Sequence, residues 1–146
     1  ALQGGIIDLT CGMTGSAIPV PQAVKQALDA GVPLERLTLS SDGNGSMPKF
    51  NENNELIGLT AAAPRYLYEE MLSIVKAGVL PFDKALQLIT CNVADALKLE
   101  DKGRIAVGKD ADLIVWNDDL TLNKVFARGR LMVDKGQAVV KGTFEN

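Results

Sequence analysis

One acidic loop holds the residue types in this chain that are best suited to catalysis. Asp42 lies in the segment SSDGNGS, residues 40–46, directly after the apolar run of residues 37–39. A carboxylate at the end of a buried strand is where enzymes of alternating strands and helices keep their chemistry. Hydrolysis led by a single Asp usually needs a metal ion, yet His, the commonest metal ligand, is absent from all 146 residues. The sequence therefore indicates one part of an active site without the rest.

Two interpretations of this loop involve no catalysis. Asp, Gly, Asn and Ser all stabilise turns, so the segment is compatible with a simple polar turn. A calcium loop is the other, because Asp42, Asn44 and Ser46 fall at the first, third and fifth positions of an EF-hand-like pattern. The pattern fails at its sixth position, where Met47 replaces Gly, and at its twelfth, where Asn53 replaces the bidentate Glu.

The third interpretation makes Asp42 a catalytic carboxylate at the C-terminal end of a barrel strand. Gly43 and Gly45 would then let the backbone approach a substrate, since neither carries a Cβ atom. Ser46 would offer that substrate a hydroxyl or a backbone N–H group. These four residues are the candidate site.

Other polar residues are weaker candidates. Asp8 lies inside the first expected strand, where it either faces the interior of a barrel or occupies an edge. Arg65 and Tyr66 begin an expected helix and are equally compatible with surface residues. Cys91 has no His partner anywhere in the chain, so we do not expect a thiol nucleophile.

The first elements that position these residues alternate between strand and helix. Residues 6–10 are short, β-branched and bounded by glycines, and residues 37–40 form a second apolar run. Between them, residues 19–30 carry apolar side chains at helical spacing, with Pro in the first turn and Gly31 after the end. This order predicts a βαβ unit with a parallel strand pair and a right-handed crossover.

The segment that follows is expected to be a loop from residue 42 to about residue 59, because it is dense in Gly and Asn and contains Pro48. A loop of that length inside a compact domain is usually functional or disordered. After it, apolar residues recur at helical spacing in three stretches, residues 64–77, 81–90 and 92–97.

After Gly103 the apolar period changes from helical spacing to alternation, which predicts an antiparallel β meander. Arg128-Gly129 suits a tight hairpin turn, and residues 134–136 suit a three-residue hairpin loop. We place a domain boundary within residues 99–108, giving domains 1–102 and 103–146. The expected strands are residues 112–116, 124–127, 130–133 and 137–141.

Composition limits the partners and the compartment. The net charge is −3 and no short stretch gathers Lys and Arg, so neither nucleic acid nor an anionic membrane is an expected partner. The two cysteines, Cys11 and Cys91, form no disulfide framework, which favours a reducing compartment. No apolar run reaches the roughly 20 residues of a membrane span. We therefore expect a cytoplasmic protein.

The chain resembles a known enzyme family in four segments. The segment of residues 40–46, followed by a Pro and a Phe, resembles the eighth-strand segment of the isoaspartyl (β-aspartyl) dipeptidases, members of the metal-dependent amidohydrolase superfamily. Residues 103–115, GRIAVGKDADLIV, resemble the general superfamily pattern where the chain leaves the barrel for a small β domain. Residues 125–133 and 140–145 resemble the C-terminus of these dipeptidases.

The resemblance implies the last two βα units of a (β/α)8 barrel, followed by strands of a small β-sandwich domain. In the family, two zinc ions are held by four His, a carboxylated Lys and an Asp at the end of the eighth strand. That Asp takes a proton from the bridging water and passes it to the leaving amine. Asp42 matches it and is thus implied to be both a metal ligand and the catalytic residue, while Ser46 matches a substrate-binding Ser.

This chain departs from the family because the His and Lys ligands, and the arginines that hold the substrate, lie upstream of the matched segment. We therefore expect a C-terminal part of such an enzyme, inactive alone and without zinc of its own. Its expected partners are the missing N-terminal portion of the barrel, an isoaspartyl dipeptide in the complete enzyme and further copies in a homo-oligomer. The alternatives are part of another amidohydrolase, or a non-catalytic structural or oligomerisation partner chain.

Overall fold

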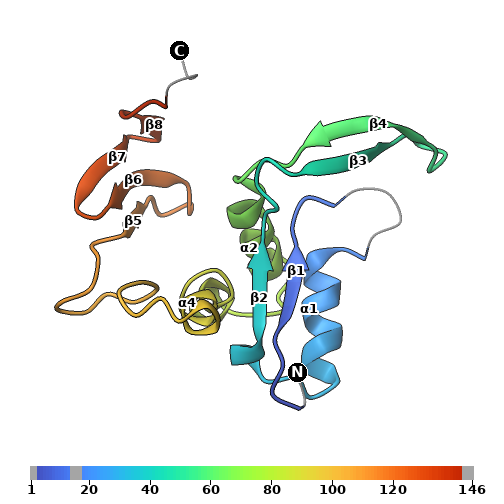
Figure 1. The fold of residues 1–146 in the computed structure, drawn as a ribbon, viewed down its shortest axis with the longest axis horizontal. Helices are drawn as coiled ribbons and strands as arrows, with labels where there is room; N and C mark the ends of the chain where they lie inside the picture. Colours follow the sequence, from blue (N-terminus) through green and yellow to red (C-terminus); the bar gives the residue numbers. More distant parts are fainter. Residues whose placement is uncertain (1–2, 14–17, 143–146) are drawn as a thin grey trace. The chain divides into compact units, whose positions relative to one another are not determined.

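The computed structural model describes residues 3–13 and 18–142. The chain divides into two compact units, Ala1–Leu97 and Lys98–Asn146. The first unit contains two two-stranded sheets, and the second contains one four-stranded sheet (Figure 1). The final residues of the motif at 140–145, from residue 143 onward, lie outside the described part of the chain.

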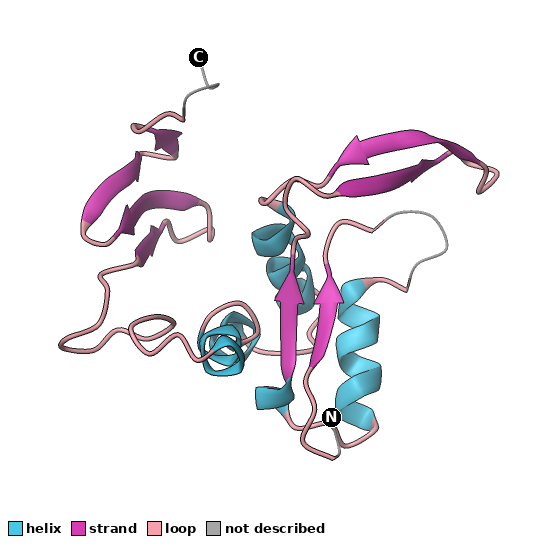
Figure 2. Cartoon of the chain, viewed as in Figure 1, coloured by secondary structure: helices cyan, strands magenta, loops and turns pink. Residues whose placement is uncertain are grey.

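The first unit begins with the predicted βαβ order. Strand β1 (Ile7–Thr10) pairs in parallel with β2 (Leu37–Ser40), and helix α1 (Val20–Asp29) connects them (Figure 2). The helix starts directly after Pro19 and ends before Gly31, whose φ of +81° is favoured for glycine. The prediction of a parallel strand pair from the sequence is therefore confirmed.

The core of this unit lies on one face of the β1–β2 pair. Leu37 and Leu39 point into it and are at most 3% exposed, and Ile7 and Leu9 pack against it from the neighbouring strand. Because side chains alternate along a strand, the even-numbered residues of both strands lie on the opposite face. The three predicted helices are present as α2 (Tyr66–Lys76), α3 (Phe82–Gln87) and α4 (Cys91–Leu97), of which α2 and α3 contribute side chains to this core.

A β-hairpin occupies the segment that the sequence predicted to be a loop. Strand β3 (Ser46–Phe50) pairs antiparallel with β4 (Leu56–Ala61), and Figure 1 shows the hairpin following the end of β2. The expected loop over residues 42–59 is therefore wrong beyond residue 45. Pro48 is tolerated because a strand of a two-stranded sheet has one edge on which no ladder donor is needed.

The turn of this hairpin is held by one asparagine. The Asn51 side-chain Oδ1 accepts hydrogen bonds from the backbone amides of Asn53 and Glu55, at 3.0 and 2.9 Å. Its Nδ2 donates to the Glu55 carboxylate at 2.8 Å. Asn54 adopts the left-handed conformation with a φ of +60°, which Asn tolerates better than most residues. The Asn-rich stretch is therefore a hairpin turn.

The second unit is an antiparallel sheet with the strand order β5-β6-β7-β8. Its described residues form this single sheet, and the expected sandwich remains a prediction. The predicted fourth strand is shorter in the structure and ends at Ala138 instead of residue 141. The strands are β5 (Leu113–Trp116), β6 (Leu122–Ala127), β7 (Arg130–Asp134) and β8 (Gln137–Ala138).

Two tight turns connect the last three strands. Arg128 and Gly129 have φ values of +49° and +76°, as expected for a type I′ hairpin turn. Lys135 and Gly136 have φ values of +51° and +75°, so the three-residue loop predicted at 134–136 is a two-residue turn of the same kind. Across residues 3–13 and 18–142, no helix is long and apolar enough to cross a membrane.

Candidate functional site

Asp42 stands two residues beyond the carboxyl end of β2, in a turn of left-handed conformation. Its φ is +47°, and that of Asn44 is +66°. The amide of Gly45 donates to the Asp42 carbonyl at 2.7 Å and closes the turn. Asp and Asn tolerate these angles because their short polar side chains make few clashes with the backbone. The structure thus places Asp42 where the sequence predicted it, at the end of a parallel strand.

The carboxylate of Asp42 lies directly over Gly45. A Cβ atom on residue 45 would lie 2.5 Å from Asp42 Oδ2 and 2.7 Å from Oδ1. A Cβ atom on Gly43 would meet the ring of Pro64 at 3.3 Å, which is a tighter contact than usual. The two glycines therefore have a packing role in seating the loop. Their expected approach to a substrate remains a prediction.

Ser46 is the first residue of β3 and is exposed. It pairs with Ala61, and the ladder continues into the Asp42 loop: Asn44 N donates to Ala62 O at 3.0 Å, and Ala62 N donates to Gly45 O at 2.8 Å. The hairpin and the loop form one hydrogen-bonded assembly. This assembly fixes the position of Ser46 relative to Asp42. The predicted substrate contact of Ser46 stays a prediction.

A second carboxylate lies on the polar face of the β1–β2 pair. Asp8 accepts a hydrogen bond from the hydroxyl of Thr38 at 2.7 Å and one from the hydroxyl of Ser40 at 2.5 Å. One carboxylate oxygen serves each hydroxyl. The structure places Asp8 on the face of the strand pair opposite the apolar core, and the choice between a barrel interior and an edge position stays open. The alternation of polar residues at positions 8, 10, 38 and 40 is the sequence signal for this arrangement.

The neighbouring thiol is buried. Cys11 is 0% exposed, and burial, followed by the charges of Glu70 and Asp8, raises its pKa to about 12. It is therefore a neutral thiol at physiological pH and is not a nucleophile. Next to it, Gly12 accommodates the ring of Tyr66, since a Cβ atom there would lie 2.3 Å from Tyr66 Cδ2.

Arg65 lies over that ring. Its guanidinium carbon lies 5.3 Å from the centre of the Tyr66 ring, and its Nε lies 3.3 Å from a Glu69 carboxylate oxygen. Both members of the ion pair are largely exposed. These contacts fit the surface role that the sequence allowed for Arg65, and they order the start of α2.

The described residues do not provide a complete metal centre. Among residues 3–13 and 18–142, no three His, Cys, Asp or Glu side chains are grouped so that they would hold an ion. The full sequence contains no His. A catalytic zinc site usually needs three protein ligands, so Asp42 supplies at most one of the required donors.

The match to a family model covers most of the molecule. The model described as "Amidohydrolase family" matches residues 19–143, which include both the Asp42 loop and the four-stranded sheet. The chain belongs to the amidohydrolase family. Proteins of this superfamily are TIM-barrel enzymes that generally bind metal, and the parallel β1–β2 pair with its helices has the α/β content of that fold.

Relatives within the family differ in what they act on. A crystal structure of β-aspartyl dipeptidase from Fervidobacterium islandicum AW-1, in complex with a β-Asp-Leu dipeptide, matches with a TM-score of 0.81 and 31% identity over 97% of this chain. Imidazolonepropionase from Anaeromyxobacter sp. (strain K) is 34% identical over 77% of the chain. Adenine deaminase 1 from Carboxydothermus hydrogenoformans is 29% identical over 70%. The chain spans 36%, 22% and 17% of these proteins, respectively.

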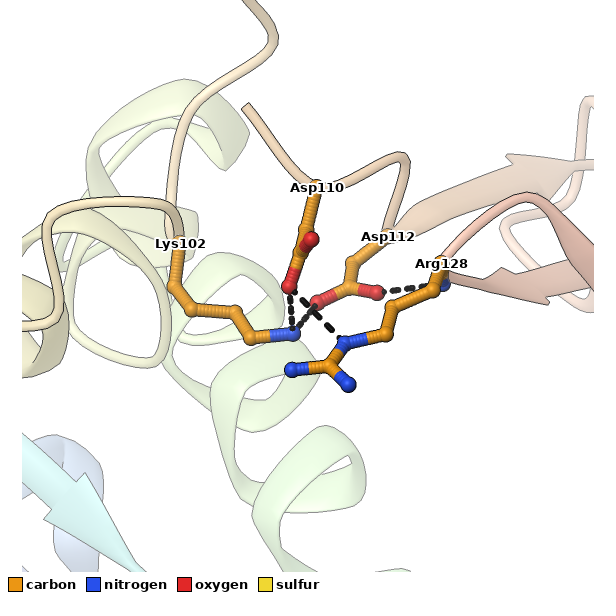
Figure 3. A network of polar contacts seen from close by, with 4 residues as sticks. All are labelled: Lys102, Asp110, Asp112 and Arg128. Carbon is orange, nitrogen blue, oxygen red and sulfur yellow. Dashed lines mark hydrogen bonds and ion pairs between the residues drawn. The ribbon is translucent and has the colours of Figure 1, made fainter. Parts of the chain in front are cut away.

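A second polar cluster in this amidohydrolase chain lies within the second unit. Figure 3 shows Lys102 between Asp110 and Asp112, with its Nζ 2.6 Å from each carboxylate. Arg128 reaches Asp110 through Nε at 3.1 Å, and its backbone amide donates to Asp112 at 2.8 Å. The cluster holds the segment before β5 against the β6–β7 turn.

Hydrogen bonding shifts the ionisation of this cluster. The hydrogen bond from Lys102, followed by that from Arg128, lowers the pKa of Asp110. The hydrogen bond from Lys102, followed by the Arg128 backbone amide, lowers the pKa of Asp112. The hydrogen bonds to Asp110, and then to Asp112, raise the pKa of Lys102. The sequence pattern at residues 103–115 indicated the family but not this network, because Lys102 precedes the pattern and Arg128 lies in a distant turn.

Proposed function

We propose that this chain is the C-terminal part of a metallo-dipeptidase that hydrolyses β-aspartyl (isoaspartyl) dipeptides, with Asp42 as its catalytic residue. The supporting observation is the likeness of the chain, over 97% of its length, to a β-aspartyl dipeptidase bound to β-Asp-Leu. Within that fold, Asp42 follows a parallel strand at its carboxyl end, which is where barrel enzymes hold catalytic groups. Residues 1–102 are then the end of the barrel, and residues 103–146 belong to the small β-sandwich domain.

The chemistry assigned to Asp42 is proton transfer. Water adds to the carbonyl carbon of the side-chain amide, and the carboxylate of Asp42 takes the proton that the water loses. The C–N bond then breaks, and the same proton goes to the leaving amine, which gives aspartate and a free amino acid. General acid–base catalysis of this kind contributes on the order of 10² to 10⁴ in rate.

The loop geometry supports this role in two ways. The turn from Asp42 to Gly45 and the ladder to Ala62 fix the backbone on both sides of the carboxylate. Gly45 leaves room for it, since any larger residue would meet the carboxylate atoms. We assign substrate contacts to Ser46, Gly43 and Gly45, which lie in the same turn and at the start of β3.

In this proposal, the zinc ligands other than Asp42 belong to the remainder of the enzyme. The amidohydrolase superfamily generally binds metal, but the described residues do not supply a ligand set. Asp42 is the single donor that we assign here. We further propose that the complete protein is a cytoplasmic homo-oligomer and that no nucleic acid or membrane is its partner.

Two other functions have specific support. Imidazolonepropionase and adenine deaminase relatives favour a different amidohydrolase reaction, on a cyclic amide or an amidine. The exposed apolar side chains of β4, Leu56 at 63% and Leu59 at 70%, favour a non-catalytic structural or oligomerisation partner chain. Large exposed apolar side chains grouped on one element are typical of an interaction surface.

An assay of the complete protein separates these functions. We expect cleavage of β-Asp-Leu, no cleavage of the α-linked isomer and no turnover of adenine or imidazolonepropionate. The variant Asp42→Asn should lose activity by at least about 100-fold, because Asn cannot accept the proton. Asp29→Asn is the matched control, since Asp29 is exposed on α1 and forms an ion pair with Lys25 in the same helix. Wild-type activity of Asp42→Asn would contradict the assignment.

A further inference from the structure

We propose that Asp8 is a positioning residue for Asp42, acting through the hydroxyl of Ser40. The inference rests on the proposed function, because it concerns the geometry of the same carboxylate. Asp8 and Ser40 stand on adjacent parallel strands, and their side chains meet at 2.5 Å. Ser40 is the last residue of β2 and precedes Asp42 by two positions.

The hydrogen bond from Ser40 to Asp8 crosses the strand pair diagonally. Asp8 pairs in register with Thr38, while Ser40 pairs with Thr10, two residues nearer the carboxyl end. The Asp8 carboxylate therefore spans from its own register partner to the end of β2. One oxygen accepts from Thr38 at 2.7 Å and the other from Ser40. The carboxylate joins the middle of β2 to the point where the Asp42 loop begins.

Ser40 is the last residue of β2 that the neighbouring strand holds. Its carbonyl accepts a hydrogen bond from the Cys11 amide at 2.7 Å, and its hydroxyl is bound by Asp8. The next backbone hydrogen bond joins Gly45 to Asp42 within the turn itself. The ladder to Ala62 holds the far side of the turn and Ser40 holds the near side, so the direction in which the Asp42 carboxylate leaves the sheet depends on how Ser40 is oriented.

The chemistry of the three groups fits a positioning role. A charged acceptor makes shorter and stronger hydrogen bonds than a neutral one, and a planar carboxylate offers two fixed directions. Thr38 is 5% exposed, so its hydroxyl needs a protein partner. Asp8 lies on the strand face away from the apolar core, where no packing contact with Leu37 or Leu39 depends on it.

The test compares two hydroxyls that share one carboxylate. In the complete protein with β-Asp-Leu, Ser40→Ala and Asp8→Ala should each lower kcat about tenfold or more with KM within about twofold, since small displacements of a catalytic group cost rate. Thr38→Val should leave kcat within about twofold of wild type, although it also removes a bond to Asp8. Asp8→Asn should recover most of the loss, because its amide still reaches both hydroxyls.

Two further results sharpen this comparison. The double variant Asp8→Ala, Ser40→Ala should have the kcat of the less active single variant, because both substitutions remove the same hydrogen bond. Equal kcat in Thr38→Val and Ser40→Ala, or wild-type kcat in Ser40→Ala, would overturn the inference. Ser40→Ala removes one hydroxyl at a half-buried position, so its kcat is informative even where Asp8→Ala lowers the stability of the fold.

A crystallographic arm separates this inference from the proposed function. We expect the Asp42 carboxylate in Ser40→Ala to move by more than about 0.5 Å from its wild-type position, beyond the tolerance of a catalytic group, and not to move in Thr38→Val. If wild-type protein cleaves no β-aspartyl dipeptide, the proposed function is wrong, and the displacement alone still decides the positioning role. An unmoved carboxylate in Ser40→Ala overturns that role whatever the activity.

Discussion

The carboxylate of Asp42 occupies the space in which a side chain of Gly45 would stand: a Cβ atom on residue 45 would lie 2.5 Å from Asp42 Oδ2 and 2.6 Å from the carboxyl carbon. The amide of Gly45 also donates to the Asp42 carbonyl. The turn brings the two residues together, and the carboxylate can keep this orientation only because residue 45 is a glycine.

Gly45→Ala should move the Asp42 carboxylate and lower the activity of the complete protein. The added methyl group cannot coexist with the carboxylate in its present orientation, because real Cβ atoms do not approach other atoms so closely. We expect kcat for β-Asp-Leu to fall by about 100-fold, the loss typical of a misplacement of about 1 Å. Asp29→Asn is again the control and should keep wild-type activity, since Asp29 is exposed on α1 and lies outside the loop. Equal activity of the two variants would contradict the prediction.

Asn92→Ala should destabilise the first unit. Asn92 is 3% exposed, and its Nδ2 donates to the carbonyls of Leu34 and Leu37 at 2.8 and 2.9 Å, which ties α4 to the start of β2. The variant leaves two carbonyls without this donor, at a cost of about 2–3 kcal/mol in the free energy of unfolding. Urea denaturation followed by circular dichroism measures the change. Asn53→Ala, at an exposed turn position, should stay within about 0.5 kcal/mol of wild type.

The sequence predicted the βαβ unit and the meander because both depend on local patterns. Apolar spacing and bounding glycines mark β1, α1 and β2 within a few residues of their ends. The type I′ turn at Arg128 and Gly129 also follows from residue types alone. These elements need no knowledge of distant contacts.

The hairpin and the Asp8 contacts were not predicted, because they depend on pairing. Pro48 and the Gly- and Asn-rich composition indicated a loop, whereas the cross-strand register of Ser46 with Ala61 makes the segment a hairpin. In the same way, the partners of Asp8 lie 30 and 32 residues away and follow only from the parallel register of β1 and β2. The sequence predicted that the loop glycines face a substrate. The packing of the Asp42 carboxylate against Gly45 could not be predicted, because it depends on atomic positions that residue types do not give.

Acid should weaken the polar cluster of the second unit, and Lys102→Met should abolish much of that effect. The hydrogen bond of Lys102 lowers the pKa of both Asp110 and Asp112 below the ordinary value of 3.8. A carboxyl with a lowered folded-state pKa adds stability above its unfolded pKa, and that stability is lost as the pH falls through the folded value. The window is therefore below about pH 4.

Carboxyl-detected NMR titration checks this prediction directly. In wild type, Asp110 and Asp112 should titrate below 3.8, and in Lys102→Met both midpoints should rise toward that value. Neither rise should be complete, because Arg128 still bonds to Asp110 through its side chain and to Asp112 through its backbone amide. Lys135→Met is the control, since Lys135 lies in the β7–β8 turn and contacts neither carboxylate. Unchanged midpoints in Lys102→Met would show that the contacts do not persist in solution.

The 146-residue chain by itself should neither bind zinc stoichiometrically nor cleave β-Asp-Leu. It contains no His, and the described residues group no three potential ligands, so Asp42 offers one donor where a catalytic zinc site uses three. Equilibrium dialysis with metal analysis should give much less than one zinc per chain at micromolar free zinc, and Asp42→Asn should not change that value. The complete protein is the positive control, in which Asp42→Asn should lower the zinc content because there the aspartate joins other ligands. Stoichiometric zinc in the isolated chain that disappears in Asp42→Asn would instead mean that these residues build a centre of their own.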